Sequence, residues 1–123
     1  MTAEGDNNIV RFTYTGRGEI PDEATHIFID ATIIDYAAFE DHPNIIEVIC
    51  HDRVKKIEGR AFWECPSLRR VVMPGVKIIG EEAFFGCKAL EGVECGKLEI
   101  IKEWAFGGCA SLRNIRPAIC QDH

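Results

Sequence analysis

Six cysteines are the residues of this chain best suited to chemistry, either as disulfides or as metal ligands. A zinc site usually takes its ligands from close pairs such as Cys-x2-Cys, and the sequence offers no two such pairs. The nearest approach is Cys120 with His123. We therefore expect no metal site and no other cofactor.

Nucleophilic catalysis has as little support in the residue pattern. The two serines, Ser67 and Ser111, both stand in a Cys-x-Ser-Leu context, where a hydroxyl can bond to local backbone. The four histidines show no arrangement with a nucleophile, and Gly16-Arg-Gly18 lacks the Gly-Lys-Ser/Thr of a phosphate loop, so it predicts a turn. We expect a protein that is not an enzyme.

An internal repeat supplies the elements that position these residues. Successive Ala-Phe pairs are separated by 23, 22 and 22 residues, and apolar columns recur at fixed offsets from each pair. The pairs begin at Ala38, Ala61, Ala83 and Ala105; the columns are Ile34, Ile57, Ile79 and Ile101, then Ile45, Leu68, Leu90 and Leu112, then Val48, Val71, Val93 and Ile115.

The spacing of apolar residues changes within each unit. Steps of 4, 1, 3 and 3 from Ile57 to Leu68 predict a short helix, and the step of two from Val71 to Met73 predicts a strand. Alternation in residues 9–14, closed by Gly16 and Gly18, predicts a capping strand. The expected fold is an α/β solenoid with one short helix and one short strand per unit of about 22 residues.

The pattern resembles the BspA-like leucine-rich repeats over about residues 25–117, best in the stretch Leu68-Arg-Arg-Val-Val-Met-Pro-Gly-Val-Lys-Ile-Ile-Gly-Glu-Glu-Ala-Phe-Phe-Gly-Cys-Lys-Ala-Leu90. His42 departs from it in the Cys column, as does Pro117 in the Met column. The chain then divides into an N-terminal tail and capping strand (1–24), the repeats (25–117) and a C-terminal tail (118–123). The resemblance implies a role in binding or adhesion.

Cys65, Cys87 and Cys109 share one repeat column beside the anchor phenylalanines. Rungs about 4.8 Å apart would allow a disulfide between neighbours, so geometry leaves the bond open. A reducing compartment favours buried thiols instead. The polar, acidic start of the chain indicates a cytoplasmic protein as written, or an extracellular one if the chain is part of a secreted parent.

Charge and hydropathy narrow the range of partners. The net charge of −6 disfavours nucleic acid, and no apolar run is long enough to insert into a membrane. We expect a non-catalytic module that binds another protein, with a fragment of a cell-surface adhesion or recognition protein as the alternative.

Residues that alternate with the strand core columns should face outward on a concave, strand-lined surface. There Phe28, Ile49 and Val72 form a column of large apolar groups, which predicts an interaction site, although strand propensity and the cap could also account for them. Charged residues flank this candidate contact zone: Glu47, Arg70 and Glu94.

Two further surfaces stand out from the repeat. Trp63 and Phe85 follow the anchor phenylalanine in adjacent units and form a second candidate patch, either as a cover for the helix layer or as anchors for a partner.

The last strand, around Ile115, has no following unit in the sequence, so we expect weak self-association through this C-terminal edge.

Overall fold

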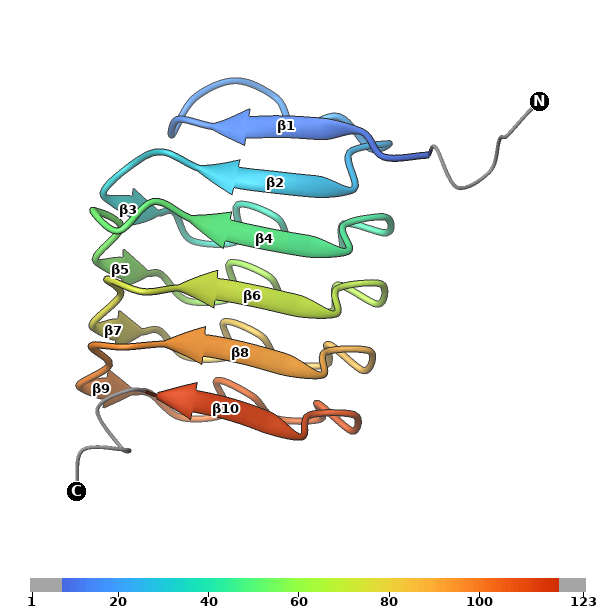
Figure 1. The fold of residues 1–123 in the computed structure, drawn as a ribbon. Coiled ribbons are helices and arrows are strands. Elements are labelled where there is room, and N and C mark those ends of the chain that lie inside the picture. The colour runs from blue at the N-terminus through green and yellow to red at the C-terminus, as the bar shows by residue number, and fades with distance from the viewer. Residues whose placement is uncertain (1–7, 118–123) are drawn as a thin grey trace.

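The structure is a stack of coils, where each coil is one turn of the solenoid. The larger of its two sheets runs the whole length of this stack. The computed structural model describes residues 8–117. Figure 1 shows six strands side by side in one layer, with short strands of a second layer behind them. All pairings are parallel, in the order β1 (Arg11–Tyr14), β2 (His26–Ile29), β4 (Glu47–Cys50), β6 (Arg70–Met73), β8 (Gly92–Cys95) and β10 (Asn114–Pro117).

A smaller sheet closes the other side of each coil, and the sequence pattern did not indicate it. Its four strands are also parallel and only two residues long: β3 (Ile33–Ile34), β5 (Lys56–Ile57), β7 (Ile78–Ile79) and β9 (Ile100–Ile101). The isoleucine column assigned above to the helix belongs to these strands. Each repeat therefore supplies two strands, one for each sheet.

The core consists of the repeat columns stacked coil upon coil. Phe39, Phe62, Phe84 and Phe106 form one continuous stack, with ring centroids 5.0, 5.1 and 5.3 Å apart and planes within 2° of parallel. Tyr14 continues the column at the N-terminal end, 5.2 Å from Phe39 and tilted by 59°. The strand columns pack beside it, so every internal coil buries its apolar side against two neighbours.

The expected helices are absent from residues 8–117, where turns occupy their place. In the coil that contains the Ala83-Phe84 pair, the N–H groups of Glu82, Phe84 and Gly86 donate to carbonyls one coil further on, at 2.8 to 3.1 Å. The intervening N–H groups of Ala83 and Phe85 bond three residues back instead. An α-helix needs every N–H to bond four residues back, so this alternation excludes it.

Left-handed backbone at two positions per coil also prevents a helix. The residue before each Ala-Phe pair has a positive φ: 57° at Ala37, 55° at Arg60, 57° at Glu82 and 63° at Trp104. The second residue after each pair does too: 63° at Asp41, 55° at Glu64, 77° at Gly86 and 72° at Gly108. A non-glycine residue there costs about 1–2 kcal/mol, which the ladder between coils must offset.

The departure at His42 joins the first coil to the N-terminal cap. The ring is buried in the Cys column, and Nε2 lies 2.8 Å from the carbonyl of Pro21 while Nδ1 accepts the N–H of Asn44 at 3.2 Å. A carbonyl only accepts, so Nε2 carries the proton. The imidazole therefore links the first coil to the cap.

Candidate functional site

The larger sheet carries a column of apolar side chains on its outer face. Phe28, Ile49 and Val72 are paired in register on β2, β4 and β6. Phe28 is 40% exposed, and Ile49 and Val72 are half-buried, while the alternate residues of these strands are buried in the core. The structure thus brings the three predicted apolar residues together on neighbouring strands.

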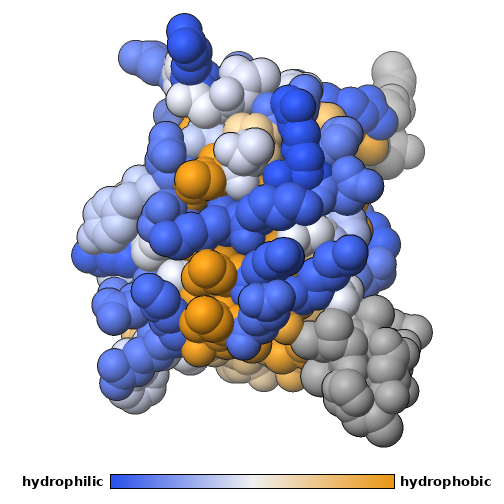
Figure 2. Space-filling view, turned by 90° about the vertical axis from the view of Figure 1, so that its left-hand side faces the viewer, coloured by the Kyte–Doolittle hydropathy of each residue, from blue (hydrophilic) through white to orange (hydrophobic). Residues whose placement is uncertain are grey.

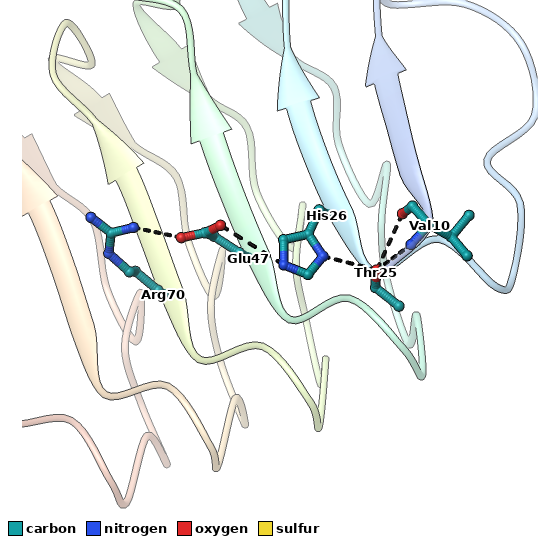
Figure 3. Close-up of polar contacts among 5 residues, drawn as sticks. All are labelled: Val10, Thr25, His26, Glu47 and Arg70. Atoms are coloured by element: carbon teal, nitrogen blue, oxygen red, sulfur yellow. Dashed lines mark hydrogen bonds and ion pairs between the residues drawn. The ribbon is translucent and has the colours of Figure 1, made fainter. Parts of the chain in front are cut away.

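A ladder of charged residues runs beside this column, as Figure 3 shows for its first members. Arg70 bonds to Glu47 on β4 and, through Nη2, to Glu94 on β8 at 3.1 Å. Both hydrogen bonds raise the pKa of Arg70, that to Glu47 most. The predicted charged residues therefore form one connected group, whose geometry the guanidinium sets by holding two carboxylates in place.

The ladder continues to the N-terminal edge of the sheet through His26 and Thr25. Nε2 of His26 lies 4.0 Å from Glu47, and its Nδ1 lies 2.8 Å from the Thr25 hydroxyl. That hydroxyl also accepts the N–H of Val10 at 2.8 Å (Figure 3). These contacts connect the segment before β1 to the charged residues of the candidate contact zone.

A shallow hollow of about 290 Å³ lies at this end of the contact zone, over β1, β2 and β4. The ring of Phe28 forms part of its wall and meets His51 edge-on, with centroids 6.5 Å apart. The remaining lining residues are Arg11, Phe12, Thr13, His26, Ile27, Glu47 and Ile49. The outer face thus combines apolar anchors, a hollow and fixed charges within one small area.

The second candidate patch lies on the turn layer. The rings of Trp63 and Phe85 are stacked with centroids 6.5 Å apart, and the guanidinium carbon of Arg60 lies 4.2 Å from the Trp63 centroid. Arg60 also forms ion pairs with Glu40 and Glu82. Both aromatic rings are half-buried, so they already contribute to packing between coils.

An apolar stripe on the smaller sheet is a surface that sequence reasoning missed. Figure 2 shows apolar residues gathered along that side of the stack, interrupted by polar ones. The outward column of the smaller sheet consists of Ile33, Lys56, Ile78 and Ile100. Lys56 lies between Ile33 and Ile78 in this column, so the exposed isoleucines do not form one continuous apolar surface.

The cysteine column is hydrogen-bonded to the backbone of the neighbouring coils. The thiols of Cys65, Cys87 and Cys109 each donate to the carbonyl of the anchor phenylalanine in the preceding coil, at 3.0 to 3.1 Å. These three and Cys50 are not joined to one another by disulfides, and no group of three potential metal ligands occurs in the part of the chain from 8 to 117. Cys120 and His123 lie outside the described residues.

Ser67 has a role similar to that of the cysteines. Its hydroxyl donates to the carbonyl of Pro43 at 2.7 Å, a bond across 24 residues to the preceding coil. The local backbone contact expected for this side chain is therefore replaced by a contact between coils.

Burial should suppress the reactivity of the cysteine column. Cys65 and Cys87 are fully buried, and hydrogen bonding to Cys65 with burial raises the pKa of the Cys87 thiol. Burial raises the pKa of Cys109 to about 12, so only a very small fraction of this thiol is ionised at pH 8. With a disulfide reagent at pH 8, Cys65 and Cys87 should react only on unfolding, whereas half-exposed Cys109 should react slowly and faster as pH rises. Rapid labelling of Cys65 and Cys87 in the native protein would contradict their burial.

The repeats that form these coils match a known protein family. The model of the BspA type leucine-rich repeat region matches residues 23–119 in six copies. The chain belongs to the BspA-type leucine-rich repeat family. The repeats of this family are here parallel two-strand coils, and among the described residues none forms a helix that could cross a membrane.

A solved structure has the same repeat fold. It is the crystal structure of a leucine-rich cell surface protein from Faecalibacterium prausnitzii A2-165, with a TM-score of 0.56 and 24% sequence identity. The match covers 81% of this BspA-type chain and 34% of that protein, so this chain spans about a third of its length. No curated protein matches the chain.

Proposed function

We propose that this chain is a non-catalytic binding module and that the outer face of the larger sheet, at Phe28, Ile49 and Val72, contacts another protein. The observation that carries the proposal is the register of these three side chains on adjacent strands, on a face that the stack does not need for its core. Burial of such a column under a partner contributes roughly 25 cal/mol for each Å² of apolar surface removed from water.

Glu47, Arg70 and Glu94 give this contact zone its selectivity. They are already hydrogen-bonded to one another, so a partner meets charges in fixed positions and loses little side-chain entropy in ordering them. Charged groups at the border of an apolar patch select among partners more than they add to affinity. We expect a partner with an apolar centre and at least one basic group that meets Glu47 or Glu94.

The double change Ile49→Glu with Val72→Glu tests this assignment. It should leave the strand signal in circular dichroism nearly unchanged and weaken partner capture at least about tenfold, because two carboxylates would be desolvated in the interface. The tagged chain serves as bait, and proteins retained by the wild type but lost by the variant are identified by mass spectrometry.

The matched control changes Ile33 and Ile78, on the outward column of the smaller sheet, to Glu. This variant should retain the same proteins as the wild type. Equal capture by both variants, or loss of the strand signal in the first one, would refute the proposed face.

A second candidate is adhesion or recognition at a cell surface, as part of a longer protein. It is supported by the family and by the solved structure that shares the fold, which is a cell surface protein. A leader or an anchor in the full gene would support it, whereas a cytoplasmic location of the protein would contradict it.

A further inference from the structure

Among the residues of the charged ladder, His26 is the one whose charge can change near neutral pH. On the outer face its charged neighbours are Arg11, paired with it on β1, and Glu47, paired with it on β4. Beyond Glu47 the ladder continues with Arg70 and Glu94, which are already hydrogen-bonded. Histidine gains a proton between about pH 8 and 5, a range in which carboxylates and guanidinium groups keep their charges. The charge at this one position of the contact zone therefore depends on pH.

The two carboxylate oxygens of Glu47 have different surroundings. Oε2 accepts a hydrogen bond from Arg70, whereas Oε1 lies 4.0 Å from Nε2 of His26, which is too far for a hydrogen bond. Oε1 can therefore accept a basic group of a partner, beside the hollow that Glu47 lines. A positive charge on the imidazole would attract the same oxygen and compete with that group.

The Thr25 hydroxyl lets His26 take up a proton without leaving a polar group unpaired. It accepts the N–H of Val10 at 2.8 Å, and its own proton has two acceptors within reach (Figure 3): Nδ1 of His26 at 2.8 Å and the carbonyl of Val10 at 3.2 Å. In the neutral ring the hydroxyl donates to Nδ1, the nearer acceptor. When Nδ1 gains a proton, the hydroxyl turns to the carbonyl and accepts from the ring instead. Rotation about one bond thus accommodates both charge states.

We propose that protonation of His26 closes Glu47 to a basic group of the partner, so that the contact zone releases this partner as the pH falls. The inference rests on the proposed function, since it concerns the same face and the same partner. The imidazolium pairs with Oε1 of Glu47 and also repels the positive charge of the partner, and both effects weaken the contact. Above the range in which histidine titrates, the ring is neutral and Oε1 is open to the partner.

NMR spectroscopy of the full chain between pH 8 and 5 tests this mechanism without a partner. The carboxylate carbon of Glu47 and the carbonyl carbon of Val10 should shift with the same midpoint as the ring of His26. Glu47→Gln should lower that midpoint by about half a pH unit, because an amide does not stabilise the imidazolium as a carboxylate does. An unchanged midpoint in this variant, or a Glu47 carboxylate that does not respond to the ring, would overturn the proposal.

His51→Gln is the matched control, because the His51 ring also lies next to Phe28 but is paired with Asp52, at 3.1 Å. In this variant the Glu47 signal should follow His26 as it does in the wild type. Circular dichroism checks that each variant keeps the strand signal. If Glu47→Gln fails to fold, Thr25→Val carries the test: it should also lower the midpoint, because Nδ1–H of the charged ring loses its acceptor.

Wild-type and His26→Gln baits, loaded at pH 7.5 and washed at pH 5.5, extend the test to the partner. Proteins whose retention requires Ile49 and Val72 should be retained about tenfold less by the wild type at pH 5.5, and equally at both pH values by His26→Gln. An equal loss from both baits would contradict a role for His26. Capture of no such protein at pH 7.5 would refute the proposed function instead, and the NMR result would still decide whether His26 controls Glu47.

Discussion

Replacing Gly75 with alanine is expected to destabilise the chain by about 3 kcal/mol or more, because the new methyl group has no room. A Cβ at this position would lie 1.9 Å from the carbonyl oxygen of Asp52, in the corresponding turn of the preceding coil. That atom is backbone, so the clash can be relieved only by moving the two coils apart. Such a movement disturbs the stacked columns on both sides of the turn.

Gly92→Ala is the control for this change, since a Cβ there meets nothing within 4 Å. Gly92 begins strand β8, where alanine also loses less conformational entropy than glycine, so we expect no loss of stability. Chemical denaturation followed by circular dichroism measures both variants. Equal midpoints for Gly75→Ala and the wild type would show that the turns are not packed as closely as described.

Phe62→Ala is expected to lower the free energy of unfolding by about 3–5 kcal/mol. The ring is fully buried in the middle of the phenylalanine stack, 5.0 Å from Phe39 and 5.1 Å from Phe84, so its removal leaves a cavity and ends two stacking contacts. The loss therefore interrupts the phenylalanine stack between Phe39 and Phe84.

Phe28→Ala removes the same side chain from the outer face, where the ring is 40% exposed. It should cost about 1 kcal/mol, since only part of the ring is packed in the free protein. Urea titration of both variants gives the comparison. Similar losses for Phe28 and Phe62 would mean that the outer column belongs to the core, and would remove the basis for the proposed contact zone.

The repeat columns and the strands of the larger sheet could be predicted from the sequence. Val48, Val71 and Val93 lie inward on β4, β6 and β8, and Ile49 and Val72 lie outward, as alternation requires. These positions depend on the spacing of apolar residues alone, which is written locally in the chain. The proposed contact zone followed from the same alternation.

The prediction of helices was wrong because the spacing of apolar residues does not specify the backbone hydrogen bonds. Ile57 on β5 and Ala61, Phe62 and Cys65 in the turns after it all face the core, as they would on one side of a helix. What excludes the helix is the ladder of bonds to residues about 22 positions away, and no local pattern contains it. One signal was available: Asp41, Glu64, Gly86 and Gly108 share a column, and Gly with Asp at one position is typical of left-handed backbone.

The smaller sheet was not predicted because its strands are only two residues long. A single alternation, such as Ile78 outward and Ile79 inward, is too short to distinguish a strand from the start of a helix.

The stacking of similar coils also determines how the chain would respond to force. Because the strands lie across the long axis of the stack, tension on the two chain ends acts on one pair of edge strands at a time. Each coil that detaches would release about 22 residues, or roughly 75 Å of extended chain. Because the same ladder of hydrogen bonds joins each coil to the next, the chain should lengthen in steps of nearly equal size.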